Sequence, residues 1–110
     1  MKINNPSRVI FTTFLDVTGS RAINATVYQN TSIYPRMVTV TMTMNTNGDN
    51  IVQFAIGATA APNSLVGEWG GNVLLTAQSY GSVTFMVPGL WYYKGTQSGT
   101  VTILAWVENV

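Results

Sequence analysis

The stretch MVTVTMTMNTNGDNIVQF, from Met37 to Phe54, alternates between apolar and polar residues and contains an Asn-Gly pair at positions 47 and 48. In its first half the even positions from 38 to 44 are valine or methionine, and the odd positions between them are threonine. Successive side chains of a β-strand point to opposite faces, so the even side is the predicted core side. An Asn-Gly pair between two alternating runs is a strong hairpin signal. The stretch therefore predicts two antiparallel strands that share one buried face.

The length of the turn sets the register of this predicted hairpin. A strict two-residue loop would place apolar residues opposite polar ones on both faces. A three-residue loop over residues 47–49 instead pairs Met44 with Val52 and Met42 with Phe54, so that apolar side chains meet apolar ones. Three-residue loops with a glycine in the left-handed conformation are a common hairpin type. We therefore predict the three-residue loop.

The threonines Thr39, Thr41 and Thr43 lie on the side opposite the predicted core. Only 8% of the residues are charged, against roughly a quarter in an ordinary soluble domain. A chain this poor in charge has little electrostatic repulsion to keep its copies apart. We therefore regard this threonine face as a candidate contact with a neighbouring subunit, with an ordinary solvent face as the alternative.

The rest of the chain also has the pattern of short strands separated by turn residues, with no convincing helix. This spacing of turn signals, about every ten residues, is typical of an all-β sandwich, jelly roll or small barrel. The sequence predicts one antiparallel β-sandwich or jelly-roll-like domain over residues 1–110, with about eight short strands. Besides the opening stretch, the predicted strands cover residues 9–17, 21–30, 72–77, 82–87, 90–94 and 100–108.

Composition argues against several classes of function. The net charge is +1 and the five basic residues are scattered, so we expect no nucleic-acid partner. The chain has no cysteine and no histidine, which removes the commonest metal ligands and the usual general base. With four acidic residues in all and no nucleophile motif, we expect no enzyme activity, no catalytic or metal site and no cofactor. No apolar run reaches the roughly 18 residues of a membrane helix, so we expect no membrane insertion.

Two regions with aromatic residues are the better functional candidates. Trp69 in GEWGGN lies in a glycine-rich segment that is predicted to be a loop. A loop tryptophan stacks on a sugar ring or anchors an interface, and the alternative is a plug over the end of the sandwich. In LWYYK the side chains of Trp91 and Tyr93 share one face, and Tyr92 lies on the other with Lys94.

The predicted last strand, in TVTILAWVENV, has apolar residues on both faces. Ile103 and Val107 lie on one side, whereas Leu104 and Trp106 lie on the other with Glu108. A strand buried on both faces in a small domain suggests that its second face meets another chain. The alternative is that a loop of the same chain covers Leu104 and Trp106.

Two segments are similar to a domain found at the C-terminal ends of tailed-bacteriophage tail fibres. The first is GSRAINATVYQNTSIYPRMVTVTM, from Gly19 to Met42, with a Gly-x-Arg, a Tyr-x-Asn-Thr and a proline before an alternating strand. The second is GSVTFMVPGLWYYKGTQSGTVTILAWVE, from Gly81 to Glu108, in which a strand ends in Val-Pro and the last strand ends in Trp and an acidic residue. The two segments cover a little under half of the chain.

The resemblance implies a trimeric β-sandwich exposed on a virion, in a structural protein assembled in the host cytoplasm. A short free-standing chain suits a knob that decorates or cements the capsid, or a small tail or fibre component. The implied partners are other copies of the chain in a homotrimer and virion proteins such as the major capsid protein. The alternative is a receptor-binding tip that recognises a host surface glycan through loop aromatics. The candidate interface or receptor contacts are Trp69, Tyr92, Leu104, Trp106, Arg21, Thr39, Thr41 and Thr43.

Overall fold

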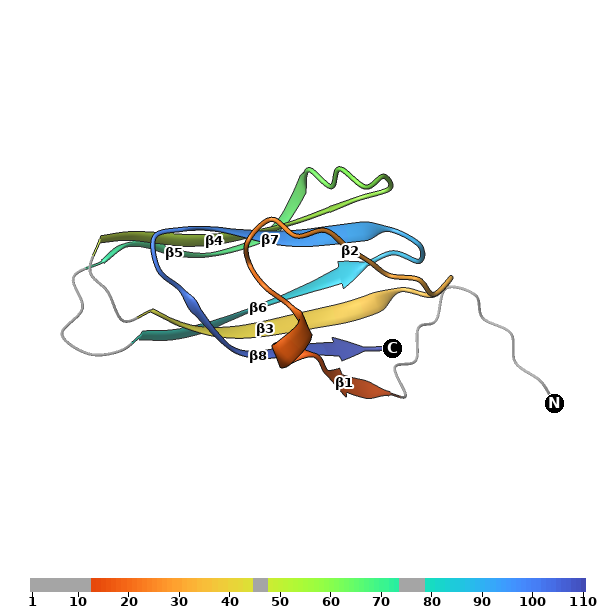
Figure 1. Ribbon diagram of the computed structural model, residues 1–110, viewed down its shortest axis with the longest axis horizontal. Helices are drawn as coiled ribbons and strands as arrows, with labels where there is room; N and C mark the ends of the chain where they lie inside the picture. The colour runs from red at the N-terminus through yellow and green to blue at the C-terminus, as the bar shows by residue number, and fades with distance from the viewer. Residues whose placement is uncertain (1–12, 45–47, 74–78) are drawn as a thin grey trace.

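The computed structural model describes residues 13–44, 48–73 and 79–110, which form two stacked four-stranded sheets (Figure 1). Sheet A contains, in spatial order, β1 (Phe14–Asp16), β8 (Thr102–Asn109), β3 (Arg36–Met44) and β6 (Ser79–Val87). Sheet B contains, in spatial order, β2 (Tyr28–Gln29), β7 (Tyr92–Ser98), β4 (Gly48–Gly57) and β5 (Ser64–Val73). Every pair of neighbouring strands is antiparallel. The predicted all-β class with about eight strands is confirmed, and the described residues include only one helical turn, the 3-10 helix η1 (Thr18–Ser20).

The core lies between the two sheets and contains the apolar side of the opening stretch. From β3 it receives Val38, Val40 and Met42, and from β4 it receives Val52 and Phe54, all of which are fully buried. The prediction that the even positions of both strands face the core is therefore confirmed. Burial of alternate side chains is what makes these segments extended, since a strand presents every second residue to one side.

The predicted hairpin between these two strands is wrong, because β3 and β4 belong to different sheets. Met42 lies opposite Gly81 of β6 on one side and Ile103 of β8 on the other. Phe54 lies opposite Gly95 of β7. Two strands that face each other across the interior bury the same set of side chains as two strands paired within one sheet, so alternation alone does not distinguish the two arrangements. Residues 45–47 of the predicted turn lie outside the described residues.

A β-bulge explains why the last strand has apolar residues on both faces. Thr41 pairs with Ala105, but the next residue, Met42, pairs with Ile103, so Leu104 is an extra residue in β8. An extra residue shifts the alternation by one position. Ile103 before the bulge and Trp106 after it therefore both point toward the core side, opposite Met42 and Val40.

The segment before β3 is less regular than predicted. Of the predicted strand over residues 21–30, only β2 is a strand, because Ala25 has a φ of 68° that interrupts the extended chain. The segment passes from η1 on sheet A to the level of sheet B along one side of the sandwich (Figure 1). Ile23 is 4% exposed and belongs to the core cluster, and the Ala25 N–H donates to Gly95 O at 2.9 Å. The segment therefore covers this side of the core.

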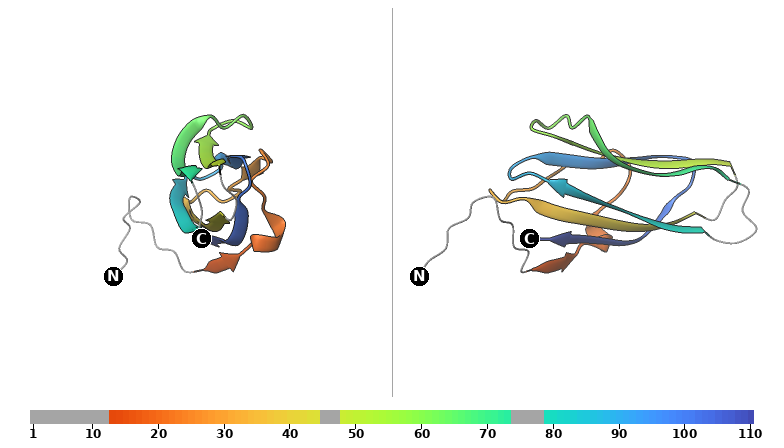
Figure 2. Two further views of the ribbon diagram at one scale, coloured as in Figure 1. Left: turned by 90° about the vertical axis from the view of Figure 1, so that its left-hand side faces the viewer. Right: turned by 180° about the vertical axis from the view of Figure 1, so that it is seen from behind.

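On the other side, β5 and β6 come close together and narrow the opening between the sheets (Figure 2). Two glycines make this approach possible, because a Cβ atom on Gly67 would overlap the Val83 side chain and one on Gly81 would overlap the Trp69 ring. The glycine-rich segment that was predicted to be a loop is thus the middle of strand β5. The other strand predictions that extend into residues 9–12 and 74–77 lie in part outside the described residues.

Candidate functional site

The largest polar cluster in the described residues surrounds the carboxylate of Glu108, which is fully buried between the sheets. Two neutral groups donate hydrogen bonds to it, the Tyr93 hydroxyl at 2.7 Å and Trp106 Nε1 at 3.0 Å. Two guanidinium groups also donate, Arg36 Nη1 at 2.8 Å and Arg21 Nε at 3.2 Å. The cluster joins β8 and β3 of sheet A to β7 of sheet B and to the segment after η1. We call these five residues the Glu108 cluster.

The environment of the cluster fixes the protonation states of its acidic groups. Burial by itself raises the pKa of Glu108, but the hydrogen bonds from Tyr93, Arg21 and Arg36 and the charge of Arg21 outweigh it and hold the pKa below its ordinary value. Burial raises the pKa of Tyr93 to about 12, and its hydrogen bond to Glu108 adds to this shift. The carboxylate is therefore ionised and the phenol protonated over the whole neutral range. Neither pKa is near 7, as a group that exchanges protons in a reaction would require.

Arg21 lies inside this cluster rather than on a free surface. Its side chain is 17% exposed, and its guanidinium stands 4.6 Å from the centroid of the Tyr28 ring. Its Nη1 also donates to Ser20 O at 3.2 Å. The Tyr28 hydroxyl in turn accepts the Ala22 N–H at 2.8 Å. Arg21 therefore attaches the irregular segment to the core, and most of its hydrogen-bonding groups are already used within the chain.

Two of the candidate tryptophans are placed differently from expectation. Trp106 is fully buried and packs edge-on against Phe54 with ring centroids 5.8 Å apart. Its ring also packs against that of Tyr28 in the segment before β3, with centroids 6.1 Å apart, so Trp106 is covered within its own chain and is not available as an interface contact. Trp69 lies in β5 and not in a loop. It is half-buried and packs against the core cluster beside Gly81, so it covers the interior and is not a freely presented aromatic.

The candidate threonines lie on the outer side of sheet A, as the alternation predicts. Thr39 and Thr41 are partly exposed, and the Thr39 hydroxyl is 3.1 Å from that of Thr84 on β6. Thr43 is only 3% exposed and donates to Ser79 O at 3.0 Å. Leu104 is 46% exposed at the bulge. Among the sequence-predicted candidates, Thr39, Thr41 and Leu104 therefore remain available on sheet A.

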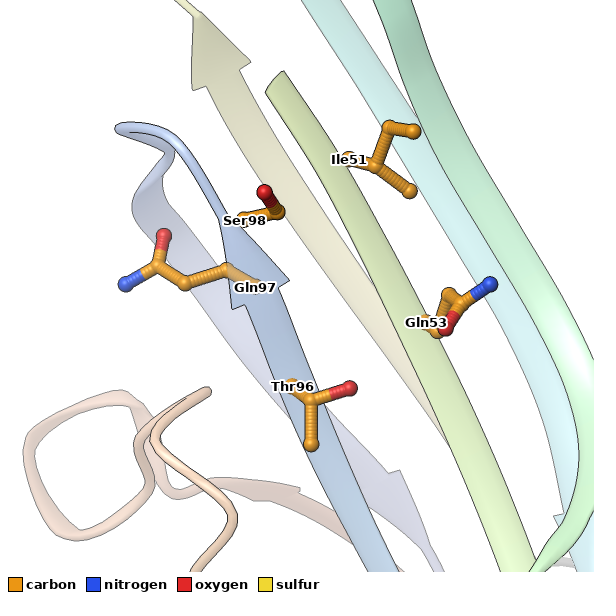
Figure 3. Close-up of a pocket in the computed structure, with 5 residues that line it drawn as sticks. All are labelled: Ile51, Gln53, Thr96, Gln97 and Ser98. Carbon is orange, nitrogen blue, oxygen red and sulfur yellow. The ribbon is translucent and has the colours of Figure 1, made fainter. Parts of the chain in front are cut away.

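Tyr92 lies on the other side of the molecule, on the outer face of sheet B, where it is partly exposed. A shallow depression of about 210 Å³ lies further along the same face, between β4 and β7 (Figure 3). Its described lining consists of Ile51, Gln53, Thr96, Gln97 and Ser98, none of which is aromatic. The Gln97 side chain accepts the Val101 N–H at 3.1 Å. The depression thus has amide and hydroxyl groups but no ring on which a sugar could stack.

Sequence reasoning missed Glu108, Arg36 and Tyr93 as a unit. The sequence did contain one signal for the cluster. Glu108 follows Trp106 by two residues, so the two side chains point to the same side of the last strand. The described residues contain no group of three or more histidine, cysteine or carboxylate side chains that could hold a metal ion. They also contain no helix long and apolar enough to cross a membrane.

The chain was compared with family models, with curated proteins and with solved structures, and none of the three comparisons finds a match.

Proposed function

We propose that this chain is a structural protein of a bacteriophage particle. In this proposal it forms a homotrimeric β-sandwich knob at the particle surface, which decorates or cements the capsid or forms a small component of the tail or its fibres. In this proposal its function is to hold neighbouring subunits together, and it catalyses no reaction.

One observation carries the proposal. The two segments that resemble tail-fibre domains, Gly19–Met42 and Gly81–Glu108, are far apart in the sequence but are joined in the Glu108 cluster. The first segment supplies Arg21, and the second supplies Tyr93 and Glu108. Arg21 and Glu108, which belong to the motifs on which the resemblance rests, thus help to hold the two sheets together, and this is the kind of role that a shared fold would require of them.

The low content of charged residues, 8% of the chain, is compatible with this role. The pKa values of Glu108 and Tyr93 lie far from neutrality, so the buried Glu108 cluster is suited to structural support. The alternative function, recognition of a host glycan through loop aromatics, loses its main candidate because Trp69 lies in a strand and covers the core.

The test has two parts. Sedimentation of the purified chain at micromolar concentration should give three times the chain mass of 11.9 kDa. Mass spectrometry of particles purified from cells that carry the gene should find the chain as a stoichiometric component, and an antibody against it should label the particles in electron micrographs. Absence of the chain from purified particles contradicts the virion assignment, whatever its oligomeric state.

A further inference from the structure

The two long sides of the sandwich are closed in different ways. On one side β5 and β6 come close together, whereas on the other side residues 19–27 cross from η1 to β2 over the space between the sheets (Figures 1 and 2). We call residues 19–27 the strap. Only Ile23 in the strap is buried; Arg21 and Ala22 are partly buried, and the rest are exposed. One side of the core is therefore covered by a segment that is itself mostly in contact with water.

Few contacts other than those of Arg21 hold the strap on the sandwich. Among the described residues, one backbone–backbone hydrogen bond joins it to a strand, from the Ala25 N–H to Gly95 O. A Cβ atom on Gly95 would overlap both the Ile23 side chain and the Phe54 ring, so Ile23 lies directly over Gly95. The φ of 68° at Ala25 lies in the left-handed region, where a residue other than glycine is strained. A short segment with so few contacts is of the kind that opens locally while the rest of a protein stays folded.

The chain is held more firmly on either side of the strap. Before it, the Val17 N–H donates to Trp106 O at 2.9 Å, and the Trp106 N–H donates to the Thr18 hydroxyl at 3.0 Å. After it, β2 pairs with β7. The strap can therefore move away from the sandwich as a loop whose two ends stay in place.

Arg21 provides the ionic contact of the strap. The guanidinium groups of Arg21 and Arg36 both donate to Oε1 of Glu108, from Nη2 at 3.3 Å and from Nη1 at 2.8 Å. A neutral carboxyl would leave these two like charges side by side without a counter-ion. Arg36 is fixed, because β3 is paired with both β6 and β8. Arg21 is the one that can leave, since its side chain is already 17% exposed and its segment has few other contacts.

Glu108 is the member of the cluster that changes its charge in acid. The described titratable or charged groups on the elements packed around it come from the strap, β3, β7, β2 and β1; they are Arg21, Arg36, Tyr93, Tyr28 and Asp16. An arginine stays protonated and a tyrosine hydroxyl stays neutral in acid. Asp16 lies outside the cluster, where it accepts the N–H and the hydroxyl of Thr18. Within the cluster, acid therefore acts on Glu108.

We propose that the contact between Arg21 and Glu108 is an acid-sensitive latch, which holds the strap closed while Glu108 is ionised and releases it when Glu108 takes up a proton. The two sheets stay paired and packed on each other, and the side of the core beneath the strap becomes open to water. The pKa of Glu108 in the folded chain is below its ordinary value of 4.5, so the latch is closed at neutral pH and opens as the pH falls from 4.5 toward the folded pKa. This inference does not depend on the proposed role in a virion.

The experiment uses one introduced thiol at a time, because the chain has no cysteine. Ile23→Cys places a thiol in the strap, where Ile23 is 4% exposed, and Val83→Cys is the matched control on β6, where Val83 is 7% exposed beneath β5. The probe is 4,4′-dithiodipyridine, which reacts with thiols in acid as well as at neutral pH, and each rate is divided by that of a cysteine peptide at the same pH. From pH 7 to pH 3 the corrected rate should rise about tenfold or more for Ile23→Cys, as expected of a local opening, and stay unchanged for Val83→Cys.

Two further substitutions in the Ile23→Cys background identify the group that responds to acid. Arg21→Met removes the latch from the strap and keeps the ion pair of Arg36 and Glu108, so the thiol should react as fast at pH 7 as at pH 3. Asp16→Asn removes the other acidic group near the strap and should leave the acid response in place.

Hydrogen exchange of the wild-type chain needs no substitution. The Ala25 amide, which donates to Gly95 O, should lose about tenfold or more of its protection between pH 7 and pH 3 through opening of the strap. The amides of β3 and β4 should keep theirs.

The outcomes decide the latch without touching the proposed function. A corrected rate at Ile23→Cys that does not rise in acid, or that rises together with that at Val83→Cys because the whole chain unfolds, overturns the latch. An acid response that survives Arg21→Met or disappears in Asp16→Asn overturns it too, as does an Ala25 amide with equal protection at the two pH values. None of these results bears on the virion assignment, and absence of the chain from purified particles does not bear on the latch.

Discussion

The Glu108 cluster and the outer side of sheet A differ in how they use the few charged side chains of the protein. The cluster gathers two arginines and a glutamate in the interior, where Glu108 is fully buried. The outer side of the three long strands of sheet A, by contrast, has hydroxyl, amide and apolar side chains, and the exposed Asp16 of β1 stands beside Val107 at its edge. The comparison teaches that three of the few charged side chains, Arg21, Arg36 and Glu108, are used to hold the two sheets together, so that few charges are left for the outer faces.

The largest expected effect comes from removing the charge at the centre of the cluster. Glu108→Gln leaves the two guanidinium groups of Arg21 and Arg36 without a counter-ion, and an uncompensated buried charge costs about 3–5 kcal/mol. Arg36 Nε has no hydrogen-bond partner among the described residues. No second acceptor therefore stands at this nitrogen to take the place of the lost carboxylate. Urea unfolding of the wild type and the variant measures the difference. A loss below about 1 kcal/mol would mean that the cluster contributes little to stability.

A smaller effect is expected from pH, because the stability of the fold should decrease both at acid pH and at alkaline pH. The pKa of Glu108 is below its ordinary value of 4.5 in the folded chain, so its contribution to stability is present above that value and is lost as the pH falls toward the folded pKa. The pKa of Tyr93 is raised to about 12 from 10, so its contribution is present below pH 10 and is lost as the pH rises toward 12.

Thermal unfolding at a series of pH values measures both changes. Tyr93→Phe should flatten the alkaline part of the profile between pH 10 and 12 and leave the acid part in place. If the loss of stability between pH 10 and 12 persists in Tyr93→Phe, it is caused by other tyrosines or by a lysine and not by Tyr93.

The smallest effect is expected on the outer side of sheet A. Thr39→Val removes the hydroxyl that lies 3.1 Å from that of Thr84 but keeps the shape and the lack of charge. Surface substitutions of this kind usually change the free energy of unfolding by less than about 0.5 kcal/mol. Urea unfolding should therefore show almost no change, and sedimentation should show an assembly as strong as in the wild type. Weakened assembly would mean that the contact between copies depends on the Thr39 hydroxyl.

The sequence predicted the candidate site less well than the fold. Thr39 and Thr41 were placed correctly on an outer face, because alternation in β3 is local and unambiguous. Trp106 was placed on the wrong side, because the extra residue Leu104 reverses the alternation within β8. Trp69 was assigned to a loop, because glycine is depleted in ordinary strands, whereas here glycines allow β5 and β6 to come together.

The sequence by itself determined which side chains of the opening stretch are buried, since a strand with period two has one apolar side wherever it lies in the fold. Only the tertiary structure decided which strands pair, because β3 and β4 bury the same residues whether they lie in one sheet or face each other across the core. It also decided the role of Glu108, whose partner Arg21 is 87 positions away in the sequence. No local pattern in the sequence encodes a contact of that range.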